Sequence, residues 1–338
     1  MTDNRKGPTL SDVARMAGVS IATASKALNG REHVRESTRQ RVFQVAEALS
    51  FVPNPLAQGL LSGQTGTVGL LTSDLEGRFS IPIMMGAEDA FGAGSTSVFL
   101  CDARGDAIRE RTQIQALLSR HVDGLIIVGA RPDPRPPLAM RIPVPVVYAY
   151  APSEDPNDYS ITSDNVHGGR LAAEHLVATG RRRIGIITGD PGYGAAHDRA
   201  SGAIAALNDA GISPLGDAAQ FGAWSEAWGR GATHAMVAAH PDLDALICGS
   251  DQIARGAMDS LRELGREIPD DVAVVGHDNW EVLAPGARPP LTSIDMRLQE
   301  LGRLAAGKLF AAIEGTASHG LDKLPCRLVP RGSTIRSS

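Results

Sequence analysis

From Thr67 onward the sequence alternates short apolar runs with longer helix-like stretches, and this alternation constrains the fold more than any other feature. The apolar runs have the length and the Val, Ile and Leu content of buried parallel strands: VGLL, SVFLC, DGLIIVG, PVVYAY, RIGIIT, ALICGS and VAVVG. Helical patterns lie between most of them, at about 82–93, 106–120, 165–179, 195–210, 225–239 and 251–265. The sequence therefore predicts an α/β protein with doubly wound parallel sheets.

These alternating segments fall into two sets. A polar, Pro-rich stretch at 151–158 and a helix starting near Asn165 separate them, so we expect two similar lobes with a cleft between them. This two-lobed part of the chain would span 67–338. Its expected lobe boundaries are about 67–163 with 292–322 for the first lobe, and 164–291 with 323–338 for the second.

The first 66 residues differ from the rest in charge. They hold eight basic and five acidic side chains, a net charge of +3, whereas the whole chain has a net charge of -5 and the remainder therefore -8. This asymmetry favours contact between the N-terminal segment and a polyanion. By itself it is a weak indication, because a solvated surface often shows an imbalance of this size.

Helix signals divide residues 1–52 into three short helices. Thr9 and Asp12 have the spacing of a capping box, Ser20 can cap a second helix that runs to about Asn29, and a third pattern covers about 36–49. The sequence predicts a helix, a tight turn and a helix, closed into one small core by the third helix.

Residues 53–66 form the expected hinge and linker. Asn54 offers an N-cap and Pro55 a first helical residue for the segment LAQGLL. A helix of two turns is marginal in water, and Gly59 weakens it further. We expect a helix that is ordered only when something holds it.

Taken together, these segments resemble the LacI/GalR (lactose-repressor) family of bacterial transcription regulators. The motifs that carry the resemblance run through the whole chain in order: TLSDVARMAGVS, ATASKALNG, VPNPLAQGL, HVDGLII, EHLVATGRRRIGIITG, ICGSDQIARGAM, DVAVVGHDN, PPLTSID and LVPRGST. The resemblance implies a helix-turn-helix domain, a hinge helix and a two-lobed core like that of periplasmic binding proteins. It also implies a sequence-specific transcriptional regulator, with a repressor expected, whose operator affinity is controlled by a sugar or sugar derivative bound in the cleft.

On the predicted second helix, one arc holds Ala24, Ala27 and Leu28 and should pack into the core, while the opposite arc faces outward. By resemblance, the outward positions Ile21, Ala22 and Lys26 read DNA bases. Lys26 could donate to guanine O6 and N7, and the two apolar residues could touch thymine methyl groups. Several family members carry an arginine at position 26, so the preferred base stays open, as does a merely solvent-facing Lys26.

Further DNA contacts follow from the resemblance. The expected DNA-backbone contacts are polar side chains near helix ends: Thr9, Ser20, Thr23, Ser25, Asn29 and His33. Thr9 and Ser20 could also act simply as helix caps. Leu60 is the expected wedge that enters a minor-groove step at the operator centre, with a buried linker leucine as the alternative.

Effector-binding candidates follow the predicted strands, because ligands of such sheets lie at the carboxyl ends of the strands. The candidates are Arg78, Phe79, Tyr150, Arg199, Trp224, Ser250, Asp251 and Asp278. By resemblance, Arg199 and Asp278 hold effector hydroxyls and Trp224 stacks on a ring. Asp251 could equally well cap the following helix.

Two positions depart from common sugar-binding members. Tyr150 stands where an Asp often lies, and Arg78 stands where an aromatic residue often lies. An added cation and a missing carboxylate favour an anionic effector, such as a sugar acid or a sugar phosphate. Alternatively, Arg78 could pair with Glu76 or Glu88.

Several classes of protein are disfavoured. The chain has no GxSxG, GxxxxGK[ST] or HExxH motif and no GxGxxG after a strand, so we expect no enzyme, no cofactor and no metal.

The alternative function is a small-molecule (sugar) binding protein without a DNA-regulatory role. The lack of a signal peptide and the N-terminal helices argue against its periplasmic form and favour a cytoplasmic protein. The expected partners are a near-palindromic DNA operator, a small-molecule effector and a second copy in a homodimer, without membrane. The chain lacks leucine heptads for a tetramer.

Overall fold

The computed structural model describes residues 8–28, 34–51, 65–74, 78–92 and 96–335. The chain forms two compact units that meet at Gly66 and Thr67. Among the described helices, none is both long and apolar enough to cross a membrane.

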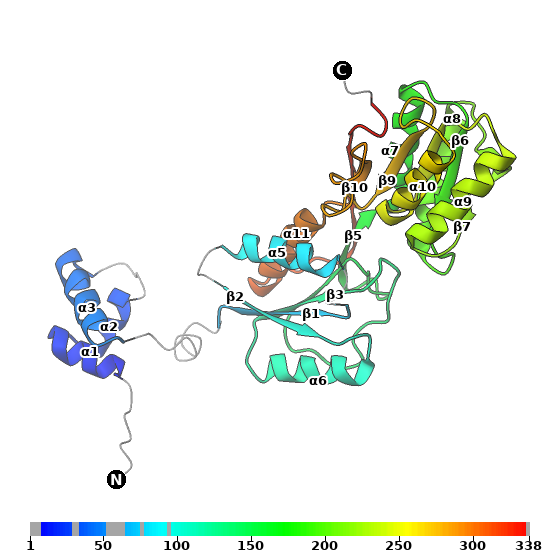
Figure 1. Ribbon diagram of the computed structural model, residues 1–338. Coiled ribbons are helices and arrows are strands. Elements are labelled where there is room, and N and C mark those ends of the chain that lie inside the picture. Colours follow the sequence, from blue (N-terminus) through cyan, green and yellow to red (C-terminus); the bar gives the residue numbers. More distant parts are fainter. Residues whose placement is uncertain (1–7, 29–33, 52–64, 75–77, 93–95, 336–338) are drawn as a thin grey trace, which may run out of the picture. The chain divides into compact units, whose positions relative to one another are not determined.

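The first unit contains the three predicted helices, α1 (Leu10–Ala17), α2 (Ile21–Leu28) and α3 (Glu36–Ala48) (Figure 1). Their small core consists of fully buried apolar side chains: Val13, Ala14, Ala17, Ala24, Ala27, Val42 and Ala46. Alanines at the contact points let the short helices approach closely. The predicted hinge helix lies outside the described residues.

The second unit begins with a six-stranded parallel sheet in the order β11-β5-β4-β3-β1-β2. Its strands are β1 (Thr67–Thr72), β2 (Ser97–Asp102), β3 (Gly124–Val128), β4 (Val146–Ala149), β5 (Tyr159–Asp164) and β11 (Gly320–Pro325). Helices α5 (Ser80–Phe91) and α11 (Leu298–Ile313) pack together on one face, and α6 (Ala107–Leu118) covers the other (Figure 1). This sheet and its helices form the first lobe.

The second lobe repeats this plan with the strand order β12-β10-β9-β8-β6-β7. Its strands are β6 (Ile184–Thr188), β7 (Gln220–Phe221), β8 (Ala245–Cys248), β9 (Ala273–His277), β10 (Thr292–Asp295) and β12 (Arg327–Val329), of which β12 alone among these described strands is antiparallel to its neighbour. Its helices are α7 (Asn165–Ala178) and α8 (Gly194–Asp209) on one face, α9 (Glu226–Ala239) and α10 (Asp251–Glu263) on the other, and a short 3-10 helix, Leu215–Asp217. The predicted fold class is confirmed.

The chain crosses between the lobes after β5, after β10 and after β11. The first crossing lies where the sequence predicts it, near Asn165. The other two differ by a few residues: Thr292–Asp295 pairs with β9 and so completes the second sheet, and residues 323–325 still pair with β5 in the first sheet. The predicted boundaries at 291–292 and 322–323 are therefore wrong by a few residues. The chain crosses only after each strand has completed its backbone pairing with its sheet.

Candidate functional site

The turn that leads into α2 is fixed by its capping residues. Asp12 N donates to Thr9 Oγ1 at 3.3 Å, and Thr9 N donates to Asp12 Oδ2 at 3.0 Å, which completes the predicted capping box. Gly18 ends α1 with φ of 66°, a left-handed conformation that glycine adopts without strain. Thr23 N then donates to Ser20 Oγ at 3.1 Å, so Ser20 caps α2.

The two faces of α2 separate as predicted. Ala24 and Ala27 are completely buried, whereas Ile21 is 52% exposed and Ala22 and Lys26 are also exposed. In the described part of the chain, Lys26 has no carboxylate partner. This outward face therefore presents two apolar side chains and one uncompensated cation, the groups that can contact base edges in a major groove.

The other polar residues of this unit are partly committed to local bonds. The Thr9 hydroxyl donates to Asp12 Oδ2 at 2.7 Å, so its proton is not available to a phosphate while the cap stands. The Ser20 and Thr23 hydroxyls share one hydrogen bond of 2.8 Å, which leaves one of their two protons for a phosphate, and Ser25 is half-buried. Three predicted DNA contacts, Asn29, His33 and Leu60, lie outside the described residues.

In the second unit, the predicted effector residues meet around Asp278, which follows β9. Arg78 Nη2, from the first lobe, donates to Asp278 Oδ2 at 2.5 Å, and Arg199 Nη1 donates to Oδ1 at 3.2 Å. Among the described residues, Asp278 is therefore the carboxylate partner of Arg78. The predicted alternative pairing with Glu88 is not observed, because Arg78 reaches across to the other lobe; Glu76 lies outside the described residues.

Aromatic rings surround these charges. The guanidinium carbon of Arg78 lies 4.9 Å from the centre of the Phe79 ring and 4.8 Å from that of Trp280. The Phe79 and Tyr150 ring centres are 5.1 Å apart. On the second lobe, the Arg199 guanidinium carbon lies 5.7 Å from the centre of Trp224. Six of the eight predicted effector residues are thus linked into one cluster.

Ser250 and Asp251 have roles that the sequence left open. Ser250, not Asp251, caps α10: its hydroxyl accepts from Ile253 N at 3.2 Å. Asp251 is fully buried and accepts from Trp280 N at 2.7 Å and from Ser293 Oγ at 2.6 Å. Burial, together with the nearby Asp278 carboxylate, raises the pKa of the Asp251 carboxyl to about 7. Asp251 therefore fixes the loop after β9, which carries Asp278 and Trp280.

The backbone at two of these residues is strained. Tyr150 has φ of 72° and Asp278 has φ of 100°, values that a side chain with a Cβ rarely adopts. Each costs about 1–3 kcal/mol and is retained only where surrounding bonds enforce it. Tyr150 N donates to Ile161 O and Asp278 N donates to Ile294 O, both at 2.8 Å, so each strained residue is tied to a neighbouring strand. Burial raises the pKa of the Tyr150 hydroxyl far above its usual range.

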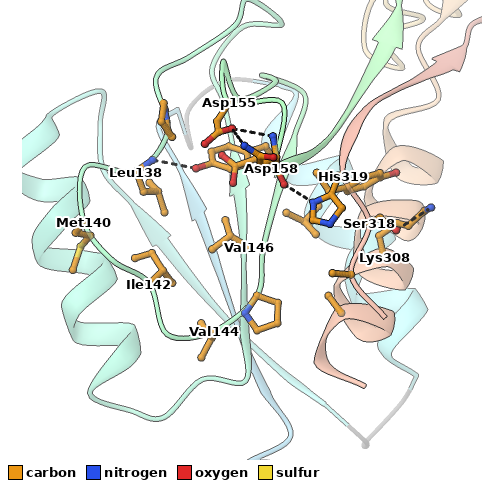
Figure 2. A pocket seen from close by; sticks show the side chains of 18 residues that line it. Leu138, Met140, Ile142, Val144, Val146, Asp155, Asp158, Lys308, Ser318 and His319 are labelled. Atoms are coloured by element: carbon orange, nitrogen blue, oxygen red, sulfur yellow. Dashed lines mark hydrogen bonds between the residues drawn. The ribbon is translucent and has the colours of Figure 1, made fainter. Parts of the chain in front are cut away.

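A hollow of about 540 Å³ lies on the first lobe, and its lining shares no residue with this cluster (Figure 2). Apolar side chains of the segment before β4, among them Leu138, Met140 and Ile142, line one side, and Lys308, Ser318 and His319 face them (Figure 2). None of the predicted effector residues lines it. Within the described ranges, no group of His, Cys, Asp or Glu side chains is arranged to hold a metal ion.

Three further residues, which are not among the predicted ones, belong to the cluster. Asn165 Oδ1 accepts from Arg199 Nε at 2.8 Å, Trp280 stacks on Arg78, and the ring centre of Tyr193 lies 5.9 Å from that of Trp224. Trp280 had a usable signal, since it is one of only three tryptophans and lies two residues after Asp278. Asn165 begins a predicted helix, but it follows a strand that the sequence pattern does not reveal, so the rule for the carboxyl ends of strands does not select it.

Comparison with known proteins agrees with this arrangement. Residues 9–54 match the model for bacterial regulatory proteins of the lacI family, and residues 173–334 match a periplasmic binding protein-like domain. The chain is 33% identical over 335 residues to the HTH-type transcriptional regulator CelR of Thermobifida fusca, covering 97% of this chain and 96% of that protein.

Two solved structures extend the likeness. The lac repressor dimer bound to operator and the anti-inducer ONPF is 30% identical, with a TM-score of 0.76 and coverage of 98% of this chain and 100% of that one. A complex of the transcriptional regulator CelR with cellobiose is 31% identical, with a TM-score of 0.66 and coverage of 96% and 99%.

The chain belongs to the LacI family of bacterial regulatory proteins. Members of this family are DNA-binding transcriptional regulators and not enzymes, and this chain is one of them. The family, fold class and regulatory function predicted from the sequence are thereby confirmed.

Proposed function

We propose that the protein represses transcription as a homodimer bound to a near-palindromic operator, and that a sugar or sugar derivative in the cleft controls its affinity for that operator. The proposal rests chiefly on the outward face of α2. Ile21, Ala22 and Lys26 are exposed on this face, while Ala24 and Ala27 on the opposite face are buried. Lys26 would select a guanine, and the two apolar residues would favour thymine methyl groups beside it.

A symmetric dimer is supported by exposed apolar side chains on the first lobe. Ile81 and Met85 on α5 are 38% and 49% exposed, and Phe99 on the neighbouring edge strand β2 is 43% exposed. An apolar patch of this kind marks a protein contact, and one helix-turn-helix reads too few base pairs to find an operator alone. The lac repressor, with the same fold, is a dimer on its operator.

The cleft has the chemistry of a site for hydroxylated ligands. A guanidinium fork, Arg199, and a carboxylate, Asp278, offer donors and acceptors to vicinal hydroxyls, while Trp224 and Phe79 offer ring faces. The related regulator CelR was solved with cellobiose. In this protein, the effector would change how the two lobes are held together and thus the geometry of the two DNA-binding units in the dimer.

A gel-shift experiment on genomic fragments of the source organism tests the proposal. A DNA regulator should shift a small subset of fragments at physiological salt, with the rest unbound. If no fragment shifts more than random DNA, with or without an added extract of cell metabolites, the alternative holds: a small-molecule binding protein without a regulatory role. We place the regulator in the cytoplasm, where its operator would be.

A further inference from the structure

Arg78 connects the two lobes through an ion pair that is mostly shielded from water. Its side chain starts between β1 and α5 of the first lobe and pairs with Asp278 of the second, and these side chains are only 17% and 2% exposed. The guanidinium lies beside the rings of Phe79 and Trp280, which shield it from water. Its Nε is buried and, among the described residues, has no acceptor. Arg78 is therefore a largely buried cation with one donor that no described residue satisfies.

Arg199 differs from Arg78 because its donors are used within its own lobe. It donates to Asn165 Oδ1 at 2.8 Å and to Gly249 O at 2.6 Å as well as to Asp278 Oδ1. Arg199 thus remains a fixed counter-charge for Asp278 whether or not Arg78 stays. Of the two ion pairs, only the one with Arg78 can be exchanged without breaking the internal bonds of a lobe.

We propose that the effector carries an oxyanion, a carboxylate or a phosphate, which takes the place of Asp278 on Arg78 and frees Asp278 Oδ2 to accept the hydroxyls of the same effector. This inference rests on the proposed function, since it names the chemical class of effector that the cleft selects. Trp224 Nε1 is a second buried donor without an acceptor among the described residues, and it too would be satisfied by oxygen atoms of the ligand.

Charge balance explains why a neutral sugar would be rejected. Arg78 and Arg199 both pair with Asp278, whereas the nearby Asp251 carboxyl accepts from Trp280 N and Ser293 Oγ instead. A neutral ligand that recruits Asp278 for its hydroxyls leaves Arg78 buried without a counter-charge, whereas an acid of the same carbon skeleton supplies one. We therefore expect the acid to bind about 10- to 100-fold more tightly, the ratio that corresponds to one hydrogen bond to a charged group.

The hollow of Figure 2 does not have this property. Its polar groups satisfy one another: Leu138 N donates to the Tyr148 hydroxyl at 3.1 Å, and the His319 ring pairs with Asn157 O at 2.6 Å. Among the described residues, no buried polar atom in its lining lacks a partner. The unsatisfied donors point to the cleft as the oxyanion site.

Calorimetric titration of the full-length protein tests the proposal. The panel pairs neutral pentoses and hexoses with their aldonic acids, uronic acids and phosphate esters, and adds acetate and inorganic phosphate as anions without a sugar. We expect at least one acid to bind at least about 10-fold more tightly than its neutral counterpart. The carboxylate and phosphate arms show which oxyanion is preferred. Neutral sugars that bind as tightly as the acids, or a panel in which no acid binds, would overturn the proposal.

Variants assign the effect to one side chain. Arg78→Gln should abolish the preference for the acid. Arg78→Lys, which keeps the charge but loses the fork, should keep part of it and covers the case in which Arg78→Gln does not fold. Arg135→Gln is the matched control, because Arg135 also pairs with a carboxylate, Glu110, at 2.8 Å on the first lobe but outside the cleft. An unchanged preference in both Arg78 variants contradicts the assignment.

The two proposals can fail separately. If acids bind but no genomic fragment shifts, the regulatory function is wrong and the oxyanion site stands. If fragments shift and only neutral sugars bind, the function stands and the role of Arg78 is wrong.

Discussion

The outward face of α2 and the cleft of the second unit hold their charged groups in opposite ways. Lys26 is exposed and, in the described part of the chain, has no carboxylate partner, so DNA can meet it without rearrangement of the protein. Asp278 and Arg199 are buried, the Arg78 side chain is only 17% exposed, and both arginines pair with Asp278. The α2 surface can therefore bind DNA as it stands, whereas the cleft must exchange internal bonds for bonds to a ligand. That exchange is what can link effector binding to a change between lobes.

The largest effect should come from removing the fixed cation of the cleft. Arg199→Met leaves the Asp278 carboxylate with Arg78 alone and the Gly249 carbonyl without its donor. Breaking a buried pair from one side typically lowers the free energy of unfolding by about 3–5 kcal/mol. Urea denaturation measures this loss.

The control breaks an exposed pair of the same lobe. Arg183→Met removes the partner of Asp242, and because both side chains are largely exposed the expected loss of stability is much smaller. Equal losses in the two variants would mean that the cleft charges are no more tightly coupled than surface charges, which would break the comparison.

A second effect should appear in the pH dependence of stability. The pKa of Asp251 is raised by burial to about 7, so the folded protein binds its proton more tightly than the unfolded chain does. Its contribution is fully present below about pH 4 and is lost as the pH rises through about 7. Asp251→Asn should remove this contribution, of the order of 4 kcal/mol for a shift of about three pKa units, from the pH profile of the free energy of unfolding between pH 4 and 7.

Matched profiles of the wild type and the Asn variant, taken by urea denaturation at several pH values, make the measurement. Asp242→Asn serves as the control, because that carboxyl is exposed and its pKa is lowered by Arg183 instead. Parallel profiles for wild type and Asp251→Asn would contradict this prediction. They would mean that Asp251 is ionised over the whole range from pH 4 to 7 and that its carboxyl is better solvated than its burial implies.

On the DNA side, the expected effect is confined to one base pair. Lys26→Ala should lower discrimination at one position in each half-site by about 1–3 kcal/mol, because the lost donors serve only that base. Competition binding with operators altered one base pair at a time measures it. Lys26→Arg should restore or sharpen the preference. A uniform loss of affinity across all operators would assign Lys26 to the phosphate backbone.

The smallest effect concerns the cap that positions α2. Thr9→Ala removes the hydroxyl that accepts from Asp12 N and should lower the local stability of α1 by about 1 kcal/mol. Hydrogen exchange of the α1 amides in the full-length protein reports this change. Ser11→Ala, an exposed position on the same helix, is the control, and equal effects in both variants would remove the capping argument.

The sequence predicts well those strands and helices whose apolar residues repeat with the period of the element. All seven apolar runs form strands, and six helices lie within a few residues of their predicted ranges. Strands β5 and β10 escape detection because their buried side chains are polar: Ser160, Thr162 and Ser293 are at most 6% exposed. Their hydroxyls are satisfied by partners that a local pattern does not reveal, such as Tyr150 O for Thr162. Helix α11 and strands β11 and β12 were likewise not predicted.

The cleft shows the same limit. The rule for the carboxyl ends of strands selects Arg78 and Asp278, and the family resemblance adds Arg199, but neither says which charges pair across 200 positions of chain. The sequence alone therefore offered Glu76 and Glu88, which are near Arg78 in the chain. The buried hydrogen bonds of Asp251 depend in the same way on the loop after β9, whose conformation is set by tertiary contacts.

The most direct test of the central claim is selection of bound sequences from a random duplex library by the full-length protein, at fixed physiological salt and without added ligand. A dimer that reads DNA through α2 should enrich a near-palindrome in which Lys26 sets the preferred base at one position of each half-site. No enrichment, both without ligand and after addition of a cell-metabolite extract, would contradict the account.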